Sequence, residues 1–69
     1  MFMQWILTQT ERDDPIGDLA NDFKNDKTRP DNRAGIDKIR RYLWLHHASS
    51  EAMEAFQDAV REYKENGVK

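Results

Sequence analysis

The sequence predicts an all-α bundle of four short helices, and three observations lead to that prediction. Apolar residues recur at the i, i+3, i+4, i+7 spacing of one helical face in separate segments of the chain. No segment alternates with a period of two for long enough to form a strand. With 69 residues, 38% of them hydrophobic, the chain has room for one core, so we expect a single domain over residues 1–69. The four helices should span about residues 2–10, 15–25, 33–46 and 50–66.

The first two helices have clear apolar faces. Phe2 and Trp5 lie one helical turn apart, and we expect both in the core. Asp14 can cap the second helix, and Pro15 suits its first position because proline has no N–H to leave unsatisfied. Gly17 should weaken this helix slightly. Its apolar face consists of Ile16, Leu19, Ala20 and Phe23.

A polar loop separates the second and third helices. It runs from residue 25 to residue 33, and Pro30 disfavours a helical conformation for Arg29. Asp31 or Asn32 should cap the third helix. The predicted face of that helix consists of Ile36, Ile39, Tyr42, Leu43 and His46.

The fourth helix follows the break at Ser49 and Ser50 and should stop at Asn66-Gly67. Small side chains at Ala52 and Ala59 should permit close approach of a neighbouring helix. Its apolar stripe consists of Met53, Phe56, Val60 and Tyr63.

Features spread over nearly the whole chain combine into one pattern. Beyond the aromatic-rich first helix and the apolar face of the second, they are the Arg12-Asp13 corner, the loop with Pro30, the segment Tyr42-Leu43-x-Leu45 and the ending Glu62-Tyr63. This pattern resembles the YozE-like family of small bacterial proteins, whose members are largely of unknown function. The resemblance implies a four-helix, SAM-like arrangement and a bacterial or phage origin, and it transfers no functional residue. Trp44 departs from the pattern, which has a polar residue at that place.

The composition restricts the cellular context. The absence of cysteine excludes a disulfide framework and a thiolate metal site, and it fits the cytoplasm. The apolar stretch from Met1 to Leu7 is too short to span a bilayer and lacks a basic leader. We therefore expect a cytoplasmic protein without a signal peptide or membrane anchor.

Two groups of side chains are candidates for metal binding or acid–base chemistry. His46 and His47 are adjacent and so point about 100° apart on a helix, whereas two ligands on one helix need i, i+4 spacing. The aspartates from residue 13 to residue 22 lack the ligand order of a calcium loop, so we expect a helix cap and a solvated face that pairs with Arg12. No phosphate-binding loop, activated serine or nucleophilic cysteine is present. The sequence therefore predicts a non-catalytic protein without a cofactor, metal or small-molecule substrate.

Charge is distributed unevenly along the chain, whose net charge is -2. Residues 1–23 carry one basic and five acidic side chains, residues 24–41 carry seven and three, and residues 42–69 carry three and five. The basic segment 27–41 could contact the phosphates of a nucleic acid, which is our alternative hypothesis. Its candidate residues are Lys27, Arg29, Arg33, Lys38, Arg40 and Arg41. The pI of 5.6 argues against it, because nucleic-acid-binding domains usually have a pI above about 9.

Trp44 and Leu45 do not fit the apolar face of the third helix. On a helical wheel Trp44 lies about 80° from Ile36, and Leu45 lies almost opposite. At least one of the pair should therefore be exposed or cover a loop, although Trp44 could instead close the core against the first helix. Our leading hypothesis is a small helical adaptor that uses Trp44 and Leu45 to bind a protein, a second copy of itself included.

Overall fold

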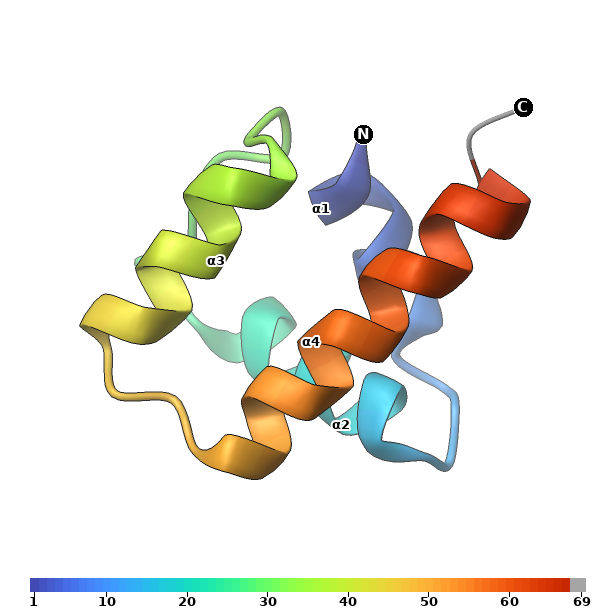
Figure 1. Ribbon diagram of the computed structural model, residues 1–69, viewed down its shortest axis with the longest axis horizontal. Helices are drawn as coiled ribbons and strands as arrows, with labels where there is room; N and C mark the ends of the chain where they lie inside the picture. The colour runs from blue at the N-terminus through green and yellow to red at the C-terminus, as the bar shows by residue number, and fades with distance from the viewer. Residues whose placement is uncertain (68–69) are drawn as a thin grey trace.

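Four α-helices and two short helical turns make up the computed structural model of the protein, which describes residues 1–67 (Figure 1). In chain order they are α1 (Phe2–Ile6), the 3-10 turn η1 (Leu7–Gln9), α2 (Pro15–Asn25), α3 (Ile36–Leu45), α4 (Ser50–Glu62) and the π-helical turn η2 (Tyr63–Gly67). Residues 1–67 contain no strand, which confirms the all-α prediction. In Figure 1, α3 forms the left side and α4 the right, with α1 between them and α2 behind the lower part of α4. Within the described residues no helix is both long and apolar enough to cross a membrane.

The predicted first helix is split into α1 and the tighter turn η1. Phe2 is buried as predicted, and its ring meets the ring of Phe56 edge to face at a centroid distance of 5.6 Å. Trp5 is only half-buried and packs against the edge of the core beside Tyr63. Met3 is fully buried although it lies outside the predicted stripe. Because α1 lies between α3 and α4, it buries more than one face (Figure 1).

The second helix begins and ends where the sequence predicts, at Pro15 and Asn25. The Asp14 carboxylate caps it by accepting a hydrogen bond from the Gly17 N–H at 2.8 Å. Gly17 does more than the sequence suggested, because a Cβ at this position would lie 2.0 Å from the carbonyl oxygen of Arg12. Only glycine lets α2 approach the preceding loop this closely. The predicted apolar face is buried at all four positions, Ile16, Leu19, Ala20 and Phe23.

The third helix begins three residues later than predicted, at Ile36. The prediction that Asp31 or Asn32 caps it is wrong. The Asp31 carboxylate accepts from the Arg33 N–H, and the Asp31 carbonyl accepts from the Ala34 N–H, both at 2.8 Å. This local turn competes with a helix cap. Gly35 is the cap residue instead, without a side-chain hydrogen bond. On the predicted face Ile39 and Leu43 are buried, Ile36 and Tyr42 are half-buried, and His46 is exposed.

The fourth helix is capped by the Ser49 hydroxyl, which accepts from the Ala52 N–H at 3.1 Å. Regular α-helix ends at Glu62, four residues before the predicted end, and continues as the turn η2. Ala59 is buried, as a residue that permits close helix packing should be. Of the predicted stripe, Phe56 and Val60 are buried, and Met53 and Tyr63 are half-buried.

Replacing Gly17 with alanine should destabilise the fold by about 3 kcal/mol, because the new methyl group forces α2 away from the Arg12 carbonyl. This loss should exceed the gain of about 1 kcal/mol that alanine brings to a helix interior. Gly35→Ala is the matched control, since a Cβ there meets nothing within 4 Å, and its loss should stay below about 1 kcal/mol. Urea unfolding compares the two variants, and equal stabilities would contradict the close packing at Gly17.

Candidate functional site

Trp44 and Leu45 lie at the carboxyl end of α3, and both side chains are on the surface. Trp44 is 72% exposed and Leu45 is 54% exposed. The prediction that at least one of the two side chains lies outside the core is therefore confirmed, and in fact both do. The alternative, in which Trp44 closes the core against the first helix, is wrong. A large apolar pair on the outside of so small a domain is the kind of surface that partners cover.

A shallow groove of about 430 Å³ lies beside Trp44, between α3 and α4. Its walls are almost entirely apolar. The residues that line this Trp44 groove are Asp37, Arg40, Arg41, Trp44 and Met53. The first four share one face of α3 at helical spacing, whereas Met53 comes from α4 and is half-buried. The sequence reasoning missed Met53, because only the folded chain brings α4 beside the end of α3.

The end of α3 is fixed by His47, whose φ of 57° is left-handed. Its N–H donates to the Trp44 carbonyl at 3.1 Å, and the Ala48 N–H donates to the Leu43 carbonyl at 3.0 Å. This pair of bonds is a Schellman motif, which closes the last helical turn immediately after Trp44 and Leu45. His46 stacks on Tyr42 with ring centroids 4.1 Å apart. Among the described residues, no three histidine or carboxylate side chains gather closely enough to hold a metal ion.

Two of the six predicted phosphate-binding side chains have structural partners. The Arg29 guanidinium donates to the carbonyls of Phe23 and Lys24 near the end of α2, at 3.3 and 3.5 Å. Arg40 pairs with Asp37 at 2.8 Å, and its guanidinium carbon lies 5.5 Å from the centroid of the Phe56 ring. Arg29 thus ties the loop to α2 and Arg40 contacts α4, and these contacts reduce what either side chain offers to a ligand.

The other four predicted basic residues are exposed and fall into two places. Lys27 and Arg33 belong to the loop before α3. Lys38 and Arg41 lie on α3, and Arg41 lines the Trp44 groove. The structure therefore divides the predicted patch between a loop and α3, where Arg41 but not Lys38 lines the Trp44 groove.

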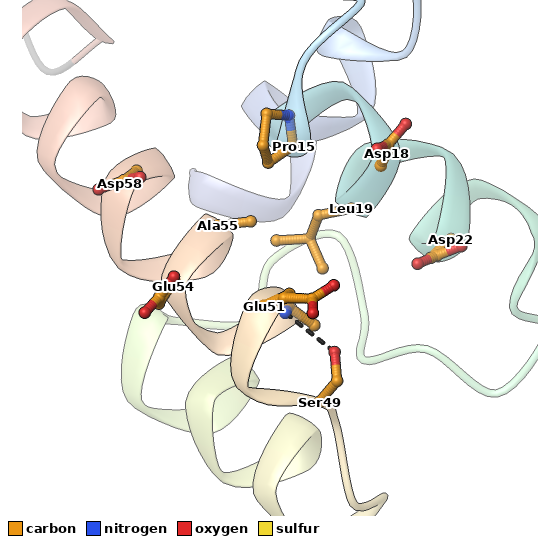
Figure 2. Close-up of a pocket in the computed structure, with 10 residues that line it drawn as sticks. Pro15, Asp18, Leu19, Asp22, Ser49, Glu51, Glu54, Ala55 and Asp58 are labelled. Carbon is orange, nitrogen blue, oxygen red and sulfur yellow. Dashed lines mark hydrogen bonds between the residues drawn. The ribbon is translucent and has the colours of Figure 1, made fainter.

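A second groove, of about 360 Å³, lies between α2 and α4 (Figure 2). Small and apolar residues such as Leu19 and Ala55 form its floor, and Figure 2 shows carboxylates on both rims. The five carboxylates of this acidic groove are Asp18, Asp22, Glu51, Glu54 and Asp58. The predicted solvated face of α2 is confirmed for Asp18 and Asp22, which are exposed, but the opposing row on α4 was missed. Since no lysine, arginine or histidine within residues 1–67 lines the groove, this side of α4 is acidic, whereas Lys38 and Arg41 are exposed on α3.

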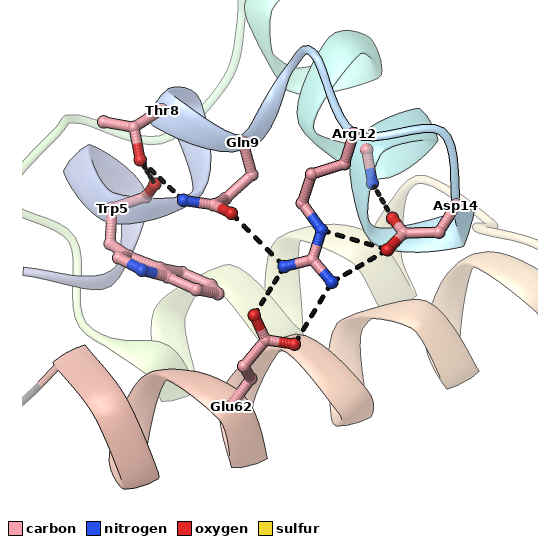
Figure 3. A network of polar contacts seen from close by, with 7 residues as sticks. Trp5, Thr8, Gln9, Arg12, Asp14 and Glu62 are labelled. Carbon is pink, nitrogen blue, oxygen red and sulfur yellow. Dashed lines mark hydrogen bonds and ion pairs between the residues drawn. The ribbon is translucent and has the colours of Figure 1, made fainter.

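Arg12 is the centre of a polar network that links three parts of the chain (Figure 3). Its guanidinium donates to Asp14 through Nε and Nη2, at 3.0 and 2.8 Å. Nη1 donates to Gln9 at 3.2 Å, and Nη1 and Nη2 each donate to one carboxylate oxygen of Glu62. These contacts use all five N–H groups that a guanidinium has. Arg12 therefore joins η1, the start of α2 and the end of α4.

The electrostatics of this network favour the charged forms of both partners. The pKa of Arg12 is raised by hydrogen bonds to Glu62 and then Asp14. The pKa of Asp14 is lowered, first by the Gly17 N–H and then by Arg12. The pairing of Arg12 with an aspartate, predicted from the sequence, is confirmed, and its link to Glu62 was not foreseen. With every donor engaged, Arg12 is placed for structure and has none left for a substrate.

A smaller polar cluster ties the end of α2 to α3. The Tyr42 hydroxyl donates to the Asp26 carboxylate, which also accepts from the Thr28 hydroxyl at 2.7 Å. The pKa of Asp26 is lowered, mainly by the Tyr42 hydroxyl and then by Thr28. The pKa of Tyr42 is raised, mainly by burial and then by Asp26. The cluster holds α3 in place beside α2.

Comparison with known proteins agrees with the fold. The family described as YozE SAM-like fold matches residues 1–65. The chain is 33% identical over 64 residues to UPF0346 protein SH1485 of Staphylococcus haemolyticus, a match that covers 93% of this chain and 88% of the relative. The name of that relative states no activity. No solved structure matches the chain significantly.

The Asp26–Tyr42 contact should make the free energy of unfolding depend on pH at both the acidic and the alkaline end of the pH range. The pKa of Asp26 is lowered from 3.8, so its contribution is complete above that value and is lost as the pH falls through the lower folded pKa. The pKa of Tyr42 is raised from 10.0, so its contribution is complete below that value and is lost as the pH rises through the higher folded pKa.

Tyr42→Phe removes the hydroxyl and keeps the ring, so the contact with Asp26 is lost. In this variant the free energy of unfolding should therefore fall less steeply than in the wild type, at low pH and at high pH alike. Urea unfolding midpoints measured across the pH range test this. Parallel pH curves for the two proteins would show that the contact does not couple folding to protonation.

Proposed function

The chain belongs to the YozE SAM-like family, and on that premise we propose that it is a non-catalytic helical module of the cytoplasm that binds a protein partner. The binding surface is the exposed pair Trp44 and Leu45 together with the Trp44 groove. The observation that supports this proposal most is the 72% exposure of Trp44 next to an almost purely apolar groove. Tryptophan buries a large area on binding and loses little conformational freedom, which is why it is common at the centre of interfaces.

Catalysis finds little support in the polar clusters. All five donors of Arg12 are engaged within the fold, and the Tyr42 hydroxyl is bound to Asp26. Binding of nucleic acid by segment 27–41 would rely on Lys27, Arg33, Lys38 and Arg41, because Arg29 and Arg40 already have partners. No further observation favours nucleic-acid binding. The crosslinking experiment described below must therefore distinguish it from protein binding.

Trp44→Ala should change the free energy of unfolding by no more than about 0.5 kcal/mol, because the side chain is exposed. Phe56→Ala, which empties a fully buried site, should cost about 3–5 kcal/mol. Urea unfolding followed by circular dichroism compares the two variants. A large loss in Trp44→Ala would mean that Trp44 serves the fold and not a partner.

A photo-crosslinking amino acid at position 45, introduced in the cells of the source organism, should yield an adduct that survives nuclease and is digested by protease. The adduct should disappear when Trp44→Ala is added, because that variant removes the centre of the surface. The same crosslinker at Lys24, an exposed position on α2, is the control and should give no such adduct. Nuclease-sensitive adducts at position 45 would favour the nucleic-acid alternative, and no adduct would refute the proposal.

A further inference from the structure

We infer that the Trp44 groove takes an acidic, amphipathic helical segment of the partner protein. This inference rests on the proposed function and adds the chemistry of the partner. Three observations support it: the shape of the groove, the charges around it, and the contacts between like charges that a symmetric dimer would create.

The groove can accommodate a row of apolar side chains. Its volume of about 430 Å³ lies in the range of pockets that hold a few large groups, about 300–1,000 Å³. Trp44 lines the groove from α3 and Met53 lines it from α4, and the exposed Leu45 follows Trp44 in the chain. Methionine adapts its shape to a bound side chain at low cost. An amphipathic helix lays its apolar stripe into such a groove.

The charges beside the groove are positive after internal pairing. Asp37 forms an exposed ion pair with Arg40, which also lies over the Phe56 ring, so the two arginines of the groove outnumber its one carboxylate. Arg41 and Lys38 are exposed and lie one and two turns before Leu45, on the same side of α3. Arg41 lines the groove and is exposed, so a carboxylate of the partner can bind its guanidinium there. A basic segment would meet like charges in the same place.

The same charges disfavour two other occupants. A symmetric dimer over the groove would place the same patch of each copy opposite the other, and so Arg41 and Lys38 would face their own counterparts. A nucleic acid would satisfy these cations, but the apolar side chains of Leu45 and Met53 would remain against a polar backbone. A protein segment with apolar residues on one face and carboxylates beside them satisfies both parts of the surface.

The test uses a displayed library of helical peptides with a constant leucine stripe and with flanking positions randomised among Glu, Gln and Lys. Selection on the full-length protein, with Trp44→Ala as the counter-selection, should enrich peptides with glutamate at the flanks. The best peptide should bind Trp44→Ala about thirtyfold more weakly. Enrichment of lysine, no charge preference, or no enrichment at all would overturn the inference.

Charge-reversal variants separate a local contact from the general effect of net charge. Arg41→Glu should weaken binding of the selected acidic peptide at least about tenfold. Lys24→Glu changes the net charge equally, but Lys24 is on α2 and lines neither groove, so binding should change less than about twofold. Equal effects of the two variants would refute a carboxylate at Arg41.

The remaining occupants give distinct results. A single-stranded oligonucleotide that displaces the selected peptide at equal concentration and salt would assign the groove to nucleic acid. Sedimentation that shows self-association lost in Trp44→Ala would assign it to a second copy. Either result overturns the acidic segment, whereas the crosslink at position 45 decides separately whether a protein binds there at all.

Discussion

The rest of the structure depends on the contact between α2 and the backbone of Arg12. The Arg12 carbonyl lies so close to Gly17 that no side chain fits between them, while the Arg12 guanidinium reaches the other way to Asp14 and Glu62. One residue thus fixes the start of α2 through its main chain and the end of α4 through its side chain. Because α4 is one rigid helix, the position of Glu62 also sets that of Met53, which forms the far wall of the Trp44 groove. The α4 wall of the candidate binding surface is therefore positioned by a contact at the opposite end of α4, whereas the Asp26–Tyr42 cluster holds its α3 side.

Helical periodicity was sufficient to predict the elements, and it failed where short-range hydrogen bonds or distant neighbours decide the outcome. The start of α2 followed from the Asp14 cap and Pro15, both of which act within a few residues. The start of α3 did not, because Asp31 bonds to the next few N–H groups in a turn instead of capping the helix. Met3 was missed because a five-residue helix between two others buries more than one face. The need for glycine at position 17 depends on a backbone atom that periodicity does not describe.

The candidate site was predictable to the extent that it lies on one helix. The angle between Trp44 and the core face follows from residue spacing alone, so its exposure could be foreseen. The partners of Arg29 and Arg40 could not, because they are carbonyl groups of α2 and an aromatic ring of α4. The pairing of Arg12 with Glu62 spans 50 positions and exists only when η1 and α4 meet. Residue spacing thus identifies which side chains leave the core, and tertiary contacts decide which of them are available to a partner.

The separation of charge by α4 has a consequence for how a partner approaches. The acidic groove lies on the α2 side of α4 and the exposed Lys38 and Arg41 lie on α3, so side chains of opposite charge face a partner from the two sides of α4. At physiological ionic strength their field extends only about 8 Å, which is less than the shortest dimension of the molecule, 19 Å. It would therefore act in the last step before collision, turning an acidic partner of the kind proposed toward α3 and away from the rim of Asp18 and Glu54. Orientation during encounter, and not only the contacts of the final complex, would then govern the rate at which the complex forms.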